Sequence, residues 1–220
     1  MSKMDTEKLK NTERYFLDRE YIVCGVDESG VSCYAGPITV CGVILNKLIL
    51  TSSHTLQYVC DCKTIKSDEK LKEHYIQVLP YVDLFIVKHI PVDVIDASKN
   101  LLNLIKSYMT SIVKVLDPDV VFVDHHVLSI HKPQFPISKG DSIFLSVAVA
   151  SIIAKYHHDA VMIELDQQFP QYDWKSNKGG ICPAHYDLIV KYGVTPHHRR
   201  KFLKRYYQEI MLNNNTGGGA

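Results

Sequence analysis

The sequence predicts an α/β domain built on a mixed β-sheet. Apolar runs of strand length alternate with longer segments whose apolar residues recur at helical spacing, a pattern typical of a sheet covered by helices. The first two strand-like runs, 21–26 and 37–45, are joined by a short connection that contains Gly30 and Gly36, so they are expected to pair antiparallel. With 220 residues, of which 46% are hydrophobic, the chain can bury one substantial core.

The first half of the chain is expected to alternate strands and helices. Ser67 is a suitable N-terminal cap for a helix, and Pro80 ends that helix because proline cannot continue it. A second stretch of helical spacing stops before Asp117-Pro118. In order, the expected elements are a loose polar leader (1–18), two strands (21–26 and 37–45), a turn-rich section (46–66), a helix (67–79), a strand (84–90) and a helix (91–116).

The second half is expected to be mainly helical after one further strand. Between Lys175 and Arg205, eight Lys or Arg residues accompany one acid, so this segment carries +7 and leaves −6 for the remainder of a chain with net charge +1. A basic segment on an acidic body suits a polyanionic partner, and a basic surface helix without a ligand is the alternative. The expected elements are a strand (120–124), a loop (132–140), a long apolar helix (142–169), two basic helices (183–192 and 197–211) and a disordered tail (213–220).

The composition indicates an intracellular protein without a membrane partner. No apolar run approaches the ~20 residues that span a bilayer. Residues 1–8 are polar and mixed in charge, unlike a secretory signal. Among six cysteines, Cys60 and Cys62 form a close pair, but no second Cys or His pair at zinc-finger spacing accompanies them. Reduced thiols and a cytoplasmic location are therefore expected.

Two acids directly follow the first strand-like run. Asp27 and Glu28 precede Gly30, an arrangement found both in solvated turns and at strand ends that bind a divalent cation. Successive strand residues point to opposite faces, so both acids can serve one site only if the strand breaks there, which Gly30 would allow. Asp124 ends a later strand in the same manner, and functional groups of α/β sheets lie where strands end.

A fourth carboxylate comes from the long apolar helix. Ser151, Lys155 and Asp159 recur every four residues and therefore share one face. Burial of Asp159 is costly unless it binds a metal or pairs with Lys155 or His158, and the spacing alone favours pairing. Four carboxylates from two strand ends and a helix would suit Mg²⁺ or Mn²⁺, which prefer oxygen ligands. Two such ions roughly 3.5–4 Å apart can activate a water and stabilise the leaving oxygen of a phosphodiester.

Seven short motifs follow one another along the chain. They are Gly25-Val-Asp-Glu-Ser-Gly30, Ala35-Gly-Pro37, Asp61-Cys-Lys63, Val123-Asp124, Lys139-Gly-Asp141, Ala150-Ser-Ile-Ile-Ala-Lys155 with Asp159, and Lys191-Tyr-Gly-Val-Thr-Pro196 with His198-Arg-Arg200. Together they cover about residues 21–202 and resemble the type 2 ribonucleases H, the ribonuclease HII and HIII enzymes. The resemblance implies an RNase H-like domain over 19–170, with a mixed five-stranded sheet flanked by helices, and a helical C-terminal extension over 171–212.

The resemblance also implies the activity and the site residues. The expected reaction is cleavage of the RNA strand of RNA–DNA hybrids, leaving 5′-phosphate and 3′-hydroxyl ends. By position, the acids that would bind two Mg²⁺ or Mn²⁺ ions are Asp27, Glu28, Asp124 and Asp159. Lys63 matches a lysine near the substrate phosphates. The other residues expected to contact the nucleic acid are Gly30, Val31, Ser32, Ser151, Lys155, Lys178 and Arg199.

The chain departs from the family pattern at the residues that recognise an RNA–DNA junction. Gly30-Val31-Ser32 stands in place of Gly-Arg-Gly, and Gly180 replaces the tyrosine of Lys-Gly-Tyr-Gly. Loss of that ring removes a stacking surface worth ~1–3 kcal/mol per base. We therefore expect weak or absent incision at a single embedded ribonucleotide and retained activity on longer hybrid tracts.

Other departures leave alternatives open. His125 replaces a glycine and Cys62 a serine. His125 and His126 are expected to be solvated loop residues, and contact with a metal-bound water is the alternative. A catalytically impaired member that only binds hybrid or structured nucleic acid, or another RNase H-like nuclease, would share part of the pattern. A monomer that acts on an RNA-containing duplex is expected.

Overall fold

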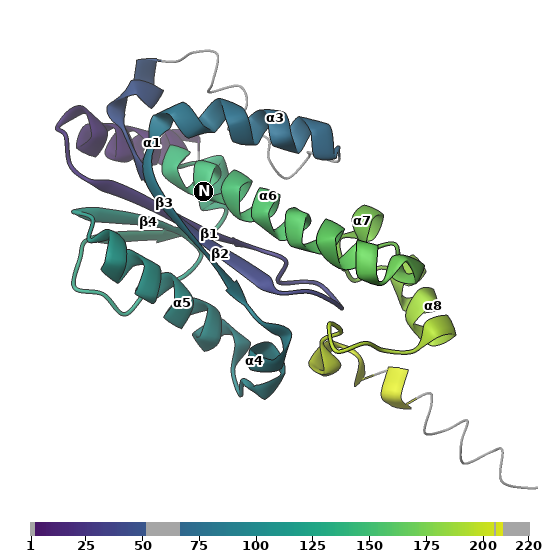
Figure 1. Ribbon diagram of the computed structural model, residues 1–220. Coiled ribbons are helices and arrows are strands. Elements are labelled where there is room, and N and C mark those ends of the chain that lie inside the picture. The colour runs from purple at the N-terminus through teal and green to yellow at the C-terminus, as the bar shows by residue number, and fades with distance from the viewer. Residues whose placement is uncertain (1–2, 52–66, 205, 209–220) are drawn as a thin grey trace, which may run out of the picture.

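The computed structural model describes residues 3–51, 67–204 and 206–208 and centres on one five-stranded β-sheet (Figure 1). Its strands are β1 (Val23–Ser29), β2 (Ile38–Leu45), β3 (Val82–Ile90), β4 (Val120–Asp124) and β5 (Gln134–Ile137). They lie in the order β3-β2-β1-β4-β5, with β2 antiparallel to β1 and β3, and with β4 parallel to β1 and β5. The predicted mixed five-stranded sheet is confirmed.

Helices cover both faces of this sheet (Figure 1). They are α1 (Lys3–Asp18), α3 (Asp68–Val78), α4 (Val92–Ala97), α5 (Leu101–Leu116), α6 (Leu145–Gln168), α7 (Trp174–Asn177) and α8 (Pro183–Tyr192), with short 3₁₀ helices η1 (Lys47–Thr51), η3 (Leu79–Tyr81), η4 (Gly140–Ser142), η5 (Pro170–Tyr172) and η6 (Arg200–Phe202). One hydrophobic cluster packs Cys24 and Val26 of β1 against α5, and another packs Val23 against α6. The two faces alternate because strand side chains have a period of two.

Two elements in the middle of the chain differ from those that the sequence predicted. β5 lies in the segment predicted as a loop, and its Pro136 sits opposite Val123 of β4 at the edge of the sheet, where a missing proline N–H is tolerated. The helix predicted over 91–116 is two helices. α5 begins after Asn100, whose side chain accepts a hydrogen bond from the backbone N–H of Asn103 at 3.0 Å.

The N-terminal segment is a docked helix, not the loose leader that its polarity predicted. Leu17 of α1 is 2% exposed and belongs to the core beneath α6. The carboxylate of Glu13 accepts hydrogen bonds from the backbone N–H groups of Leu145, at 2.6 Å, and Ser146, at 2.9 Å. Phe144, the N-cap of α6, has no side-chain capping bond, so Glu13 supplies the cap from a helix far away in the sequence.

The C-terminal segment packs against the far end of α6 (Figure 1). Tyr172 and Trp174 stack with ring centroids 5.1 Å apart, and Trp174 Nε1 donates to His185 Nε2 at 3.0 Å. α8 confirms one predicted helix. In the range of the other, the described residues form the short η6 and are helical again at 204 and 206–208. The predicted tail over 213–220 lies outside the described residues. Within the part of the chain that is described, no helix has the length and apolarity to cross a membrane.

Candidate active site

The acids of β1 and β4 meet where these two strands stop pairing. Parallel pairing ends with Val26 opposite Val123, so Asp27 and Asp124 are the next residues on adjacent strands. β1 itself continues along β2 as far as Ser29. The strand was predicted to break at the acids so that both could serve one site, but it does not break there. Instead, one side of β1 opens at that point, in the position where α/β sheets commonly bind ligands.

Asp27, Glu28 and Asp124 line one cavity of about 410 Å³, which we call the acidic pocket. Its other lining residues are the turn 29–32, Ser151 and Lys155. The last two lie four residues apart on α6 and therefore face the same side of that helix. Residues predicted from strand ends and from a helix are thus brought together.

Asp27 carries the strongest electrostatic perturbation of the acidic pocket. Burial, followed by the neighbouring charge of Glu28, raises the pKa of Asp27 well above its usual range, and the charge of Asp124 adds to this effect. The side chain of Ser151 and the backbone N–H of Glu28, at 2.8 Å, donate hydrogen bonds that oppose the rise. The pocket gathers negative charge that a bound cation would neutralise.

Glu28 and Asp124 each have one oxygen with a defined neighbour. Glu28 Oε1 lies 3.6 Å from Nε2 of His126, whereas Oε2 of Glu28 is buried without a hydrogen-bond partner. Asp124 Oδ1 accepts the N–H of Gly140 at 2.7 Å. His126 is 7% exposed, so the prediction of a solvated loop histidine is wrong for this residue. His125 is exposed and adopts φ 59°, the left-handed region that suits the glycine of the family pattern.

The donors of the acidic pocket suit a hard divalent cation. Carboxylate oxygens are the ligands that Mg²⁺ and Mn²⁺ prefer, and Glu28 has a buried oxygen without a partner. As they stand, no three or more Asp, Glu, His or Cys side chains in the described residues are arranged to hold a metal ion. Asp27 and Asp124 each direct one oxygen to a backbone N–H, which fixes the orientation of the carboxylate.

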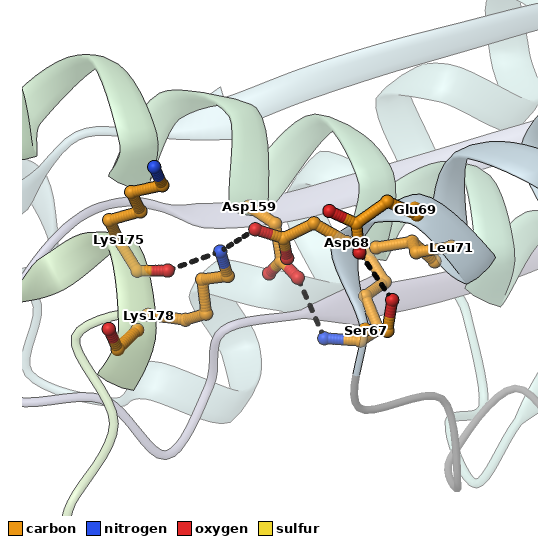
Figure 2. A pocket seen from close by; sticks show the side chains of 9 residues that line it. Ser67, Asp68, Glu69, Leu71, Asp159, Lys175 and Lys178 are labelled. Carbon is orange, nitrogen blue, oxygen red and sulfur yellow. Dashed lines mark hydrogen bonds and ion pairs between the residues drawn. The ribbon is translucent and has the colours of Figure 1, made fainter.

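Asp159 lines a neighbouring cavity of about 520 Å³, which we call the lysine pocket (Figure 2). Its walls come from the start of α3 and from the segment 175–178, and Lys155 lines both pockets. Asp159 Oδ2 accepts a hydrogen bond from Lys155 Nζ at 2.9 Å, and Asp159 Oδ1 lies 3.0 Å from His158 Nδ1. The pairing that the helical spacing favoured is therefore present. Lys178 Nζ forms an ion pair with Asp68 at 2.9 Å.

The two segments that depart from the family pattern lie side by side. The backbone N–H of Ile181 donates to the carbonyl of Ser32 at 3.3 Å. Cys33 and Gly180 form an isolated antiparallel bridge. The turn 29–32 and the segment 179–181 therefore form one continuous surface beside the acidic pocket, which we call the junction surface.

Arg199 holds the turn 29–32 from inside the protein. The expectation that Arg199 contacts the substrate is wrong, because its side chain is 0% exposed. Its guanidinium donates hydrogen bonds of 2.8 to 2.9 Å to the carbonyls of Val31, Gly36 and Pro37. Burial lowers the pKa of Arg199 to about 10. The side chain thus shapes the loop and does not face the nucleic acid.

Replacing Arg199 by alanine is expected to destabilise the protein. The change leaves three buried carbonyls without their donor, which should cost about 3 kcal/mol of unfolding free energy. Urea denaturation followed by circular dichroism measures this loss. Arg200→Ala is the matched control, because Arg200 is the adjacent, exposed arginine. Equal losses in the two variants would contradict the role of Arg199.

Lys63 cannot be placed, and the buried acid Asp141 was not predicted as a site residue. Lys63 falls in the segment 52–66, which is not among the described residues. Asp141 is 6% exposed and lies on η4, directly after Gly140, whose N–H binds Asp124. The motif Lys139-Gly-Asp141 is the sequence signal that points to this turn.

Comparison with known sequences shows the family to which this chain is similar. The sequence model of the ribonuclease HII family matches residues 24–209. The chain is 36% identical over 196 residues to the ribonuclease HII of Ruegeria sp. (strain TM1040), covering 85% of this chain and 81% of that protein. It is 30% identical over 203 residues to the ribonuclease HII of Rickettsia canadensis, covering 90% of this chain and 97% of that protein.

Solved structures share the fold at lower sequence identity. The ribonuclease H2 from Pyrococcus horikoshii OT3 superposes with a TM-score of 0.70 at 19% identity, covering 84% of this chain and 98% of that chain. Bst-RNase HIII in complex with Mn²⁺ superposes with a TM-score of 0.63 at 19% identity, covering 79% of this chain and 63% of that chain. The predicted RNase H-like architecture is confirmed by these likenesses.

Proposed function

The chain belongs to the ribonuclease HII family and is a ribonuclease H, and we propose that it cuts the RNA strand of RNA–DNA hybrids in the acidic pocket. The observation that carries this proposal is the meeting of Asp27, Glu28 and Asp124 where β1 and β4 stop pairing. A divalent cation bound there can activate a water for attack on a phosphodiester and stabilise the leaving oxygen. The proposed products carry 5′-phosphate and 3′-hydroxyl ends.

We assign Asp27, Glu28 and Asp124 to the binding of Mg²⁺ or Mn²⁺, with two ions per site. Ser151 orients Asp27 by a hydrogen bond, and the backbone N–H of Gly140 orients Asp124. Family resemblance adds Asp159 as a fourth acid. Its pairing with Lys155 and His158 supports a different role, so our metal assignment does not include it.

Lysines around the two pockets are proposed to contact the substrate backbone. Lys155 lines both pockets and Lys178 lines the lysine pocket, so both ammonium groups stand where a bound strand would carry its phosphates. Lys63 is expected from the resemblance to lie near the same strand. Each phosphate neutralised by such a contact contributes about −0.9 to the slope of log K against log salt concentration for a duplex.

The proposal also includes a monomeric chain that acts inside the cell. The cysteines of the described residues, Cys24, Cys33, Cys41 and Cys182, are free thiols. Burial raises the pKa of Cys24 to about 12, so this thiol stays protonated and inert. Free thiols suit a reducing compartment. Size-exclusion chromatography with light scattering tests the monomeric state.

A cleavage panel tests the proposed activity and its substrate range. Duplexes with one ribonucleotide, four ribonucleotides and a full RNA strand should be incubated with the protein under Mg²⁺ and under Mn²⁺. We expect cleavage of the four-ribonucleotide and full-hybrid duplexes, and weak or absent incision at the single ribonucleotide, because the junction surface lacks the aromatic ring. Cleavage of no duplex would refute the proposed activity. Equal rates on all three would refute only the substrate range.

Replacing Gly180 by tyrosine is expected to raise single-ribonucleotide incision. A Cβ added at Gly180 would lie 3.1 Å from the Asn177 carbonyl, so the side chain needs only a small shift of its neighbours. The ring would restore a stacking surface worth ~1–3 kcal/mol, equivalent to about a 5- to 150-fold gain. Ile181→Tyr, which adds the same ring one residue later on an exposed side chain, is the matched control.

A further inference from the structure

The carboxylate of Asp159 is held between two neighbours on its own helix. Its side chain is 6% exposed, with one oxygen 2.9 Å from Lys155 Nζ and the other 3.0 Å from His158 Nδ1. Burial raises the pKa of Asp159, but the hydrogen bond from His158 and the charge of Lys155 outweigh burial, and the net effect is a lowered pKa. Both oxygens of this charged group are therefore occupied by residues of α6.

Lys155 stands at the boundary between the acidic pocket and the lysine pocket. It lines both, and its side chain is 31% exposed, so its ammonium group can reach a ligand in either. A lysine has a flexible four-carbon side chain, and its charge acts at a defined point only if a partner holds it. Asp159 supplies that partner from one helical turn away.

His158 lies beneath the turn that begins the junction surface. The ring is 2% exposed, and a Cβ added at Gly30 would lie 2.3 Å from its Cδ2 atom. Gly30 has φ 80°, so its backbone approaches the ring closely in a conformation that favours glycine. The contact between His158 and Asp159 fixes the orientation of the ring, and the ring in turn supports the turn.

We propose that Asp159 is a positioning residue of the nuclease, which acts through Lys155 and His158 and does not ligate the catalytic cations. Asp159 holds the Lys155 ammonium group at the acidic pocket, where it meets a substrate phosphate, and holds the ring on which the turn 29–32 rests. This inference rests on the proposed function, because it assumes that the acidic pocket binds a nucleic acid. It assigns Asp159 to substrate binding and leaves metal binding to the strand acids.

A double-mutant cycle on substrate binding tests the coupling to Lys155. Asp159→Asn, Lys155→Gln and the double variant should be titrated against a fluorescent RNA–DNA hybrid by anisotropy in EDTA, where no cleavage occurs. Each single change is expected to weaken binding by about fivefold. The double variant should lose clearly less affinity than the product of the two single losses, because part of the effect of Asp159 passes through that lysine. If the loss of affinity in the double variant equals the product of the losses in the two single variants, the proposal is overturned. Lys114→Gln is the charge control, because Lys114 is an exposed lysine of α5, which packs on the face of the sheet opposite to α6.

Direct measurement of Mn²⁺ binding by electron paramagnetic resonance separates positioning from ligation. Asp159→Asn should keep the Mn²⁺ affinity of the wild type within about twofold, whereas Asp124→Asn should lose about tenfold or more. A loss in Asp159→Asn as large as that in Asp124→Asn would show that Asp159 is a ligand and overturn the proposal. Both measurements are independent of turnover, so a wild type that fails to cleave hybrids refutes the proposed function and leaves this test intact.

Thermal unfolding of each variant controls for folding. If Asp159→Asn does not fold, Lys155→Gln alone carries the test. It must weaken hybrid binding and retain full Mn²⁺ affinity, and unchanged hybrid binding would refute the role given to Lys155.

Discussion

Asp27→Asn is expected to abolish cleavage of RNA–DNA hybrids. The substitution keeps the size of the side chain and its acceptor oxygen for the Glu28 N–H, but it removes a negative charge from the centre of the acidic pocket. Loss of a cation ligand removes several kcal/mol of transition-state stabilisation, so the single-turnover rate should fall by about 10³-fold. Gel analysis of a labelled hybrid with Mg²⁺ measures this rate.

The same variant is expected to be more stable than the wild type in EDTA. The pKa of Asp27 is raised in the folded chain, first by burial and then by Glu28. The stability that this group contributes is therefore present below its unfolded pKa, about 3.9, and is lost as pH rises through the folded value. Asparagine does not titrate, so the difference in Tm between the variant and the wild type should widen as pH rises from about 4 to about 8.

Two controls distinguish these effects from a general loss of structure. Asp93→Asn removes an exposed carboxylate of α4 and should leave the cleavage rate and Tm unchanged. Addition of Mg²⁺ should raise the Tm of the wild type and not that of Asp27→Asn, because bound cation stabilises only the protein that retains its ligands. Full activity in Asp27→Asn, or a Tm below that of the wild type in EDTA, would contradict the assignment of Asp27.

Glu13→Ala is expected to destabilise the whole fold. The carboxylate accepts the Leu145 and Ser146 N–H groups at the start of α6, and it also accepts the Ser146 hydroxyl. Alanine would leave these buried donors without partners, at a cost of about 3 kcal/mol. For a chain of this size, such a loss lowers Tm by about 6–12 °C. Differential scanning calorimetry measures both quantities.

A pair of related variants tests whether the loss comes from the cap. Glu13→Gln keeps an acceptor oxygen and should lose less stability than Glu13→Ala. Glu20→Ala removes an exposed glutamate that pairs with Lys47 after the same helix, and no measurable change in Tm is expected. Comparable losses in Glu13→Ala and Glu20→Ala would show that α1 is not anchored through Glu13.

Local sequence was sufficient to locate most strands and to place three acids directly after apolar stretches of these strands. β1, β2, β3 and β4 follow apolar runs whose length and flanking turns identify them. In β1, β2 and β4 the runs are continuous because these strands are buried on both faces, whereas β3 is a partly exposed edge strand. The shared face of Ser151, Lys155 and Asp159 follows directly from the helical period. The order of seven motifs then indicated the family, and the match of the ribonuclease HII family model to residues 24–209 confirmed it.

Features that depend on contacts between distant segments of the chain could not be predicted from the sequence. β5 is recognised by its pairing with β4, and α1 by the burial of Glu13 and Leu17 against distant residues. Arg199 matches a motif of the family, yet it donates to carbonyls more than 160 residues away and never reaches the surface. The sequence gives the charge of a side chain, but packing determines which groups it binds.

The acidic pocket shows the same division. The sequence alone indicates that Asp27, Glu28 and Asp124 directly follow the apolar stretches of two strands, because apolar runs are local properties of the chain. How these acids meet depends on pairing between distant segments: β1 continues along β2 past its last pair with β4, so the opening lies beside an intact strand. The pairing of Asp159 with Lys155 or His158 was already favoured by the helical spacing, whereas the packing of α6 places Asp159 beside the neighbouring pocket.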